Sequence, residues 1–162
     1  MCIVIDASTL AKVFNPDNKE HSHFAPVLAW IEKRQGYVVY GGTKYKKELK
    51  ESYMRLFNEL KNTGKAVPIN DAKVDASELT VKMLTQGKKC DDEHIIALLG
   101  VSLCSLFCTS DIRSIPFMRD KALFPKQMPR VRCYTQARNK KLLTKSDPRR
   151  LANTEACLAT DA

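Results

Sequence analysis

The feature that most constrains the fold is an uninterrupted apolar run at residues 2–5, which ends at Asp6. A short run rich in β-branched residues is typical of a strand that is buried on both faces, as strands are in a parallel sheet. A strand so early in the chain usually lies in the middle of the sheet. The run therefore predicts an α/β fold.

Strand and helix patterns alternate along the rest of the chain. Four further apolar runs, at residues 37–40, 66–69, 106–109 and 131–134, predict strands. Apolar residues at helical spacing separate most of these runs, and such alternation is the pattern of α/β architecture.

Glycines and a threonine mark the ends of the predicted helices. Gly36 is expected to end a helix that precedes residues 37–40, as a C-terminal cap. Thr43 is a candidate N-cap for the clearest helix, which has one apolar face and is expected to run on to Gly64. A later helix is expected to end at Gly87.

Length and composition are those of one globular domain. The chain has 162 residues, with 44% hydrophobic and 28% charged residues, which fits neither a disordered nor a fibrous protein. Basic residues gather from Arg138 onward, and the final dozen residues lack periodicity. We therefore expect a domain at residues 1–136 and a basic tail at residues 137–162.

The excess of basic residues favours an anionic partner. Lys and Arg number 27 against 18 Asp and Glu, a formal charge of +9, so nucleic acid is the first candidate. An excess of charge that serves only to keep the protein soluble is the alternative.

The cysteines and the N-terminus bear on the cellular compartment. The six cysteines form no C-x-x-C pair and are expected to be free thiols. The N-terminus lacks a signal-peptide pattern and residues 95–108 are too short to span a bilayer, so we expect a cytoplasmic protein with no membrane partner.

Four acidic residues are placed where they could meet. Asp6 and Asp111 follow predicted strands, and ligands of open α/β sheets gather at the carboxyl ends of strands. Asp92 precedes a helix and Glu48 lies early in another, so both could reach the same edge. Four carboxylates there would repel one another unless they bind a hard cation such as Mg²⁺ or Mn²⁺, and such a site suits phosphodiester hydrolysis.

Each acid also has an ordinary structural interpretation. Asp6 could cap one helix and either Asp91 or Asp92 another, and Asp111 could be a turn residue. Glu48 could pair with a neighbouring lysine, and Glu51 is its rival for the site. The joint placement of the acids is what favours a shared site.

The same residues resemble the motifs of a known family. Ile3-Val4-Ile5-Asp6-Ala7-Ser8 is similar to the first motif of PIN domains, and the segments 92–98 and 107–111 are similar to the third and fourth. The resemblance covers residues 1 to about 135 and matches Glu48 to the helical glutamate of the family. It implies a three-layer α/β/α sandwich with a mostly parallel sheet, and a Mg²⁺- or Mn²⁺-dependent ribonuclease.

By resemblance, Asp6, Glu48, Asp92 and Asp111 are catalytic metal ligands, supported by the hydroxyls of Ser8 and Thr109. The resemblance also implies a homodimer and a toxin of the VapC type with an antitoxin partner, or a defence nuclease. Many members carry a further charged residue after the fourth motif, where this chain has Ser114. The candidate RNA contacts are Lys44, Lys47, Arg113, Arg138, Lys140 and Lys141.

Two other functions remain open on sequence grounds. The first is a PIN-like module without catalysis that binds nucleic acid or protein through its basic surface. The second is a phosphatase-like enzyme with Asp6 as nucleophile, which the pattern favours less because Ser8 stands where the second aspartate is expected.

Overall fold

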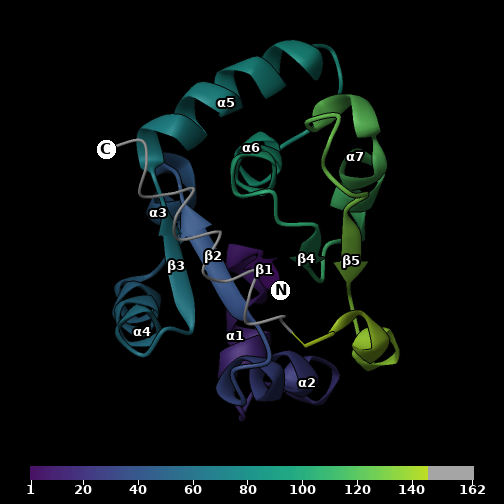
Figure 1. Cartoon of the computed structure of the whole chain (residues 1–162). Helices are drawn as coiled ribbons and strands as arrows, with labels where there is room; N and C mark the ends of the chain where they lie inside the picture. Colours follow the sequence, from purple (N-terminus) through teal and green to yellow (C-terminus); the bar gives the residue numbers. More distant parts are fainter. Residues whose placement is uncertain (146–162) are drawn as a thin grey trace.

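The computed structural model describes residues 1–145, which form a three-layer α/β/α sandwich around a five-stranded sheet (Figure 1). The strand order is β3-β2-β1-β4-β5, and every neighbouring pair is parallel. All five apolar runs are strands, and the predicted α/β sandwich is confirmed. The strands are β1 (Cys2–Ile5), β2 (Tyr37–Gly41), β3 (Ala66–Ile69), β4 (Leu106–Cys108) and β5 (Arg132–Tyr134).

Helices cover both faces of the sheet. Figure 1 shows α1, α2 and α4 on one side and α5, α6 and α7 on the other. The helices are α1 (Leu10–Phe14), α2 (His21–Glu32), α3 (Thr43–Glu48), α4 (Glu51–Asn62), α5 (Asp71–Leu84), α6 (Glu93–Ser102) and α7 (Ile115–Arg119), with the 3₁₀ turns η1 (Ala7–Thr9), η2 (Ile112–Ser114), η3 (Lys121–Leu123) and η4 (Ala137–Leu142).

The core is centred on β1, β4 and α6. All three residues of β4 are buried, as are residues 94–100 of α6. A helix that is buried all round belongs to the interior of a fold, and α6 contacts β1, β2 and β3. This burial fixes the N-terminus of α6, which carries Asp92, relative to the sheet.

The prediction of one helix from Thr43 to Gly64 is wrong in one respect, because the segment forms two helices. Leu49 and Lys50 adopt extended backbone angles (ψ of 131° and 153°) and separate α3 from α4. Leu49 is buried, so tertiary packing breaks the helix where no proline or glycine does. Glu48 is therefore the last residue of α3.

The cap of α3 also differs from the prediction. Gly42, with φ of +88°, is the N-cap, and Thr43 is the first helical residue. The backbone N–H groups of Gly42 and Thr43 donate to the carboxylates of Asp71 (2.9 Å) and Asp75 (2.8 Å). Acids of α5 thus replace the cap that the sequence places at Thr43.

Gly36 is not the C-cap of α2. The helix ends at Glu32, and Arg34 takes the left-handed conformation instead, with φ of +54°. Gly36 is small for another reason: a Cβ at this position would lie 1.8 Å from the indole of Trp30. The prediction for Gly64 is confirmed, since it follows α4 with φ of +70°.

The connection between α5 and α6 is an open turn. The α5 helix ends at Leu84, and Gly87 follows in the left-handed conformation with φ of +78°. A Cβ at Gly87 would meet no atom within 4 Å, and residues 86–89 are exposed. This turn joins the part of the chain that forms β1, β2 and β3 to the part that forms β4 and β5.

The first residues of the predicted basic tail are ordered against the domain. Residues 137–142 form η4, which contacts α2, and the indole N–H of Trp30 donates to the carbonyl of Thr144 at 2.9 Å. The rest of the predicted tail, residues 146–162, lies outside the described residues. Across residues 1–145, no helix combines the length and apolarity needed to cross a membrane, and the five cysteines of this part are free thiols.

Candidate active site

The strand order reverses between β1 and β4, and this reversal positions two of the acids. In open α/β sheets, ligands bind outside the carboxyl ends of strands at such a switch point. Asp6 directly follows β1, and its backbone N–H donates to the carbonyl of Cys108 at the end of β4 (2.9 Å). Asp111 lies three residues beyond β4. Both acids therefore lie at the same edge of the sheet.

All four predicted acids line one open groove of about 780 Å³. Glu51 does not line it: its side chain is 86% exposed and lies 3.9 Å from Arg55 on α4. The geometry thus brings Glu48, and not its rival, to the other acids. The groove is lined by Asp6, Ala7, Ser8, Glu48, Lys50, Lys89, Asp91, Asp92, His94, Asp111, Arg113 and Phe117.

Asp6 is held in place by two hydroxyl groups. Its carboxylate accepts hydrogen bonds from the Ser8 hydroxyl (2.9 Å), the Ser8 backbone N–H (3.2 Å) and the Thr109 hydroxyl (2.9 Å). The backbone N–H of Asp111 donates to Oγ1 of Thr109, so one hydroxyl links the loops that follow β1 and β4. Asp6 also caps η1, so its structural role and its place in the groove coexist.

Asp92 is the acid with the most perturbed ionisation. It occupies the N-cap position of α6, but its side chain does not cap the helix and makes no hydrogen bond or ion pair with residues of the described part. Burial, followed by the charges of Asp6 and Asp111, raises the pKa of Asp92 to about 6. The groove therefore holds a carboxylate that gains from a cation but forms no ion pair within the described chain.

Glu48 is oriented by His94. Nε2 of His94 lies 3.0 Å from Oε2 of Glu48, and burial lowers the pKa of this histidine despite the nearby carboxylate. A neutral imidazole must then donate from Nε2 to Glu48, which leaves Nδ1 as an acceptor. Nδ1 is buried and has no hydrogen-bond partner within residues 1–145. The neighbouring Lys44 donates instead to the carbonyl of Asp91 (3.1 Å).

Asp111 is paired with Arg113. The arginine donates from Nε and Nη2 to both carboxylate oxygens, at 2.7 to 3.1 Å, and its backbone N–H also donates to Oδ1. These hydrogen bonds lower the pKa of Asp111. Arg113, a candidate RNA contact, therefore lies in the groove with its guanidinium engaged by an acid.

The other candidate RNA contacts lie outside the groove. Lys44 and Lys47 are on α3, and neither lines it. Two lysines outside this candidate set, Lys50 and Lys89, do line it. The remaining candidates lie together on η4 beside α2, and these are Arg138, Lys140 and Lys141.

The donor chemistry of the groove fits Mg²⁺ or Mn²⁺, since its acids supply the hard oxygen ligands that these ions prefer. The arrangement is not a preformed coordination shell. Within residues 1–145, no three acidic, histidine or cysteine side chains are grouped closely enough to hold one ion. Glu48 and Asp111 are each engaged by a neighbour, whereas Asp92 has no such partner.

Comparison with known proteins identifies no family for this chain. No model of a protein family matches the chain. Neither a curated protein nor a solved structure matches it either. The groove itself is therefore the basis on which a function can be proposed.

Proposed function

We propose that this chain is a Mg²⁺- or Mn²⁺-dependent ribonuclease that hydrolyses RNA phosphodiester bonds in the acidic groove. The observation that carries the proposal is the convergence of Asp6, Glu48, Asp92 and Asp111 on one groove, with the pKa of Asp92 raised to about 6. A bound Mg²⁺ or Mn²⁺ would supply Lewis-acid activation of the attacking water and of the phosphate.

The protein itself contributes orientation and charge. Ser8 and Thr109 hold the Asp6 carboxylate in one orientation, and His94 does the same for Glu48. Such supporting hydrogen bonds are what keep a metal-binding carboxylate in place. Asp92, which has no such partner in the described chain, is the acid most available to bind a cation.

Basic residues along the groove favour a polyanionic substrate. Lys50, Lys89 and Arg113 line it, and the chain carries a formal charge of +9. The choice of RNA over DNA rests on the resemblance of the strand-end motifs to PIN domains. The same resemblance supports a cytoplasmic toxin or defence nuclease, homodimeric and with an antitoxin partner, as the biological setting.

A second function is favoured by one specific observation. Arg113 occupies the Asp111 carboxylate with two nitrogens, so that acid is already neutralised without a metal ion. A groove of this kind could hold nucleic acid without cleaving it. This second candidate is therefore a catalytically inactive nucleic-acid-binding module.

One experiment separates the two functions. Labelled RNA and DNA are incubated with the protein and Mg²⁺ or Mn²⁺, with and without EDTA, and Asp6→Asn and Asp92→Asn are compared with wild type. The matched control is Asp17→Asn, an exposed aspartate outside the groove. We expect RNA cleavage that EDTA, Asp6→Asn and Asp92→Asn abolish and that Asp17→Asn leaves intact. Folded wild-type protein that binds RNA and leaves it uncut would refute the ribonuclease and favour the module.

A further inference from the structure

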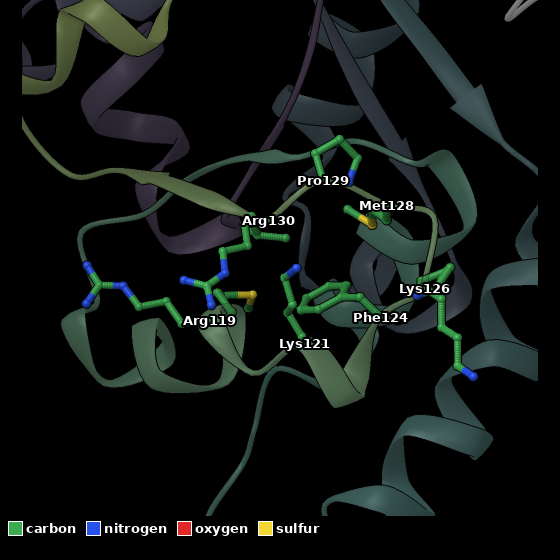
Figure 2. Close-up of a pocket in the computed structure, with 10 residues that line it drawn as sticks. Arg119, Lys121, Phe124, Lys126, Met128, Pro129 and Arg130 are labelled. Carbon is green, nitrogen blue, oxygen red and sulfur yellow. The ribbon is translucent and has the colours of Figure 1, made fainter.

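A second cavity, of about 170 Å³, lies between α7, η3 and the start of β5 (Figure 2). Its floor is apolar: Met118, Met128 and Val131 are buried there. Phe124 is half-buried and adds an aromatic ring to the wall. The cavity therefore offers an apolar surface and one ring to whatever enters.

The charged residues around this cavity are all basic. Arg119, Lys121, Lys126 and Arg130 line it, no acidic residue does, and all four are exposed. None of them forms an ion pair with another residue in the described part of the chain. Figure 2 shows Phe124 and Lys126 on one side of Lys121 and the two arginines on the other. The rim thus complements an anion that has an apolar, flat part.

The cavity wall is anchored to the rest of the protein. Pro125 packs beside Gly100 of α6, where a Cβ on this glycine would make van der Waals contact with the proline ring at 3.4 Å. Asp120 caps η3 by accepting from the Ala122 backbone N–H (3.0 Å), and its carboxylate lies 3.7 Å from Lys88. Asp120 is thus paired with Lys88 and does not line the cavity, and the wall contacts the helix that follows Asp92.

The cavity and the acidic groove are neighbours across α7. Phe117 lines the groove, whereas the next two residues, Met118 and Arg119, line the cavity. A polymer that crosses this helix can therefore occupy both. Single-stranded RNA meets the requirements, because an unpaired base can stack on an aromatic ring while basic side chains neutralise the phosphates beside it.

We propose that this cavity is a nucleotide subsite for single-stranded RNA that extends from the acidic groove. One base stacks on Phe124 over the apolar floor, and Lys121 and Arg130 contact the adjoining phosphates. The inference rests on the proposed function for the identity of the polymer, and it assigns a position on the protein to the RNA beyond the groove.

The test measures binding separately from cleavage. Fluorescence anisotropy with labelled single-stranded RNA is recorded over a range of salt concentrations, in a background of Asp6→Asn and in EDTA. We expect Phe124→Leu to weaken binding by about 5- to 100-fold, the effect of losing one stacked base. Phe124→Tyr, which keeps the ring, should bind as the parent does.

The charges are tested with exposed residues, which can be changed without disturbing the core. Lys121→Ala with Arg130→Ala should lower the slope of log affinity against log salt by about 0.7 for each phosphate that the protein no longer neutralises. The control is Lys33→Ala with Lys61→Ala, which removes the same charge from exposed positions outside both cavities and should leave that slope unchanged.

The outcomes distinguish the two proposals. RNA cleavage by wild type, with parental affinity in both the Phe124→Leu and the double-alanine protein, overturns the subsite alone. Binding that depends on Phe124 and Lys121, without cleavage in Mg²⁺ or Mn²⁺, overturns the ribonuclease and supports the subsite. An equal loss for double-stranded RNA overturns the assignment to an unpaired base.

Discussion

Replacing Asp92 with asparagine tests the electrostatics of the groove through the stability of the protein. In the folded state, burial and the charges of Asp6 and Asp111 raise the pKa of Asp92 from 3.8 to about 6. Between pH 3.8 and about pH 6, the Asp92 carboxyl therefore holds a proton in the folded state that it loses in the unfolded chain. The contribution of this group to the free energy of unfolding is therefore greatest below pH 4 and falls as the pH rises to 6.

The size of the effect follows from the pKa. A pKa that rises from 3.8 to about 6 corresponds to about 3 kcal/mol in the free energy of unfolding, and solvent screening in an open groove lowers this to about 1–2 kcal/mol. Asparagine removes the charge and hence this cost. At pH 7 we expect Asp92→Asn to raise Tm by roughly 2–8 °C. At pH 4, where Asp92 is protonated in the folded protein, the gain should largely vanish.

Thermal unfolding followed by circular dichroism, at pH 7 and pH 4 in EDTA, measures both quantities. Asp17→Asn is the matched control and should leave Tm unchanged at both pH values. A Tm for Asp92→Asn that is equal to or below that of wild type at pH 7 would refute the reasoning, as would an equal gain at both pH values. Addition of Mg²⁺ should then raise Tm for wild type more than for Asp92→Asn, because only wild type keeps all four acids.

Three further predictions concern the surroundings of the groove. Tyr45→Phe removes the buried hydroxyl that donates to the carbonyl of Ile5 (2.6 Å), and should cost about 1–3 kcal/mol in urea unfolding; an unchanged midpoint would contradict this. Arg113→Ala should raise the pKa of Asp111 toward its ordinary value in a carboxyl ¹³C NMR titration, and a pKa that stays low would exclude the guanidinium as its cause. Gly36→Ala places a methyl group against the neighbouring indole and should destabilise the protein by about 1–3 kcal/mol or more, so wild-type stability in urea would show that this contact is absent.

Sequence reasoning located the acids that follow strands, because the chemistry of a strand end is local. Residues 2–5 and 106–108 are apolar enough to be recognised, and the residues after them must then lie at one edge of a parallel sheet. The position of Asp6 and Asp111 at this edge could be predicted from these two runs alone. The architecture follows from the same alternation of patterns.

The hydrogen bond between Glu48 and His94 could not be predicted in this way. The two residues are 46 positions apart, and a histidine in an apolar helix is usually structural. The break at Leu49 and Lys50, which ends α3 at Glu48, carries no proline or glycine. Both features depend on tertiary packing, which cannot be read from a single sequence.

The open turn at Gly87 divides the four predicted acids equally. Residues 1–87 carry Asp6 and Glu48, and residues 88–145 carry Asp92 and Asp111. Neither segment alone holds more than two of the four predicted acids, so a cut in this turn would make the groove depend on reassociation of two fragments. Dividing the protein at this turn gives two fragments, and recovery of the groove when they are mixed would report that the fragments have associated.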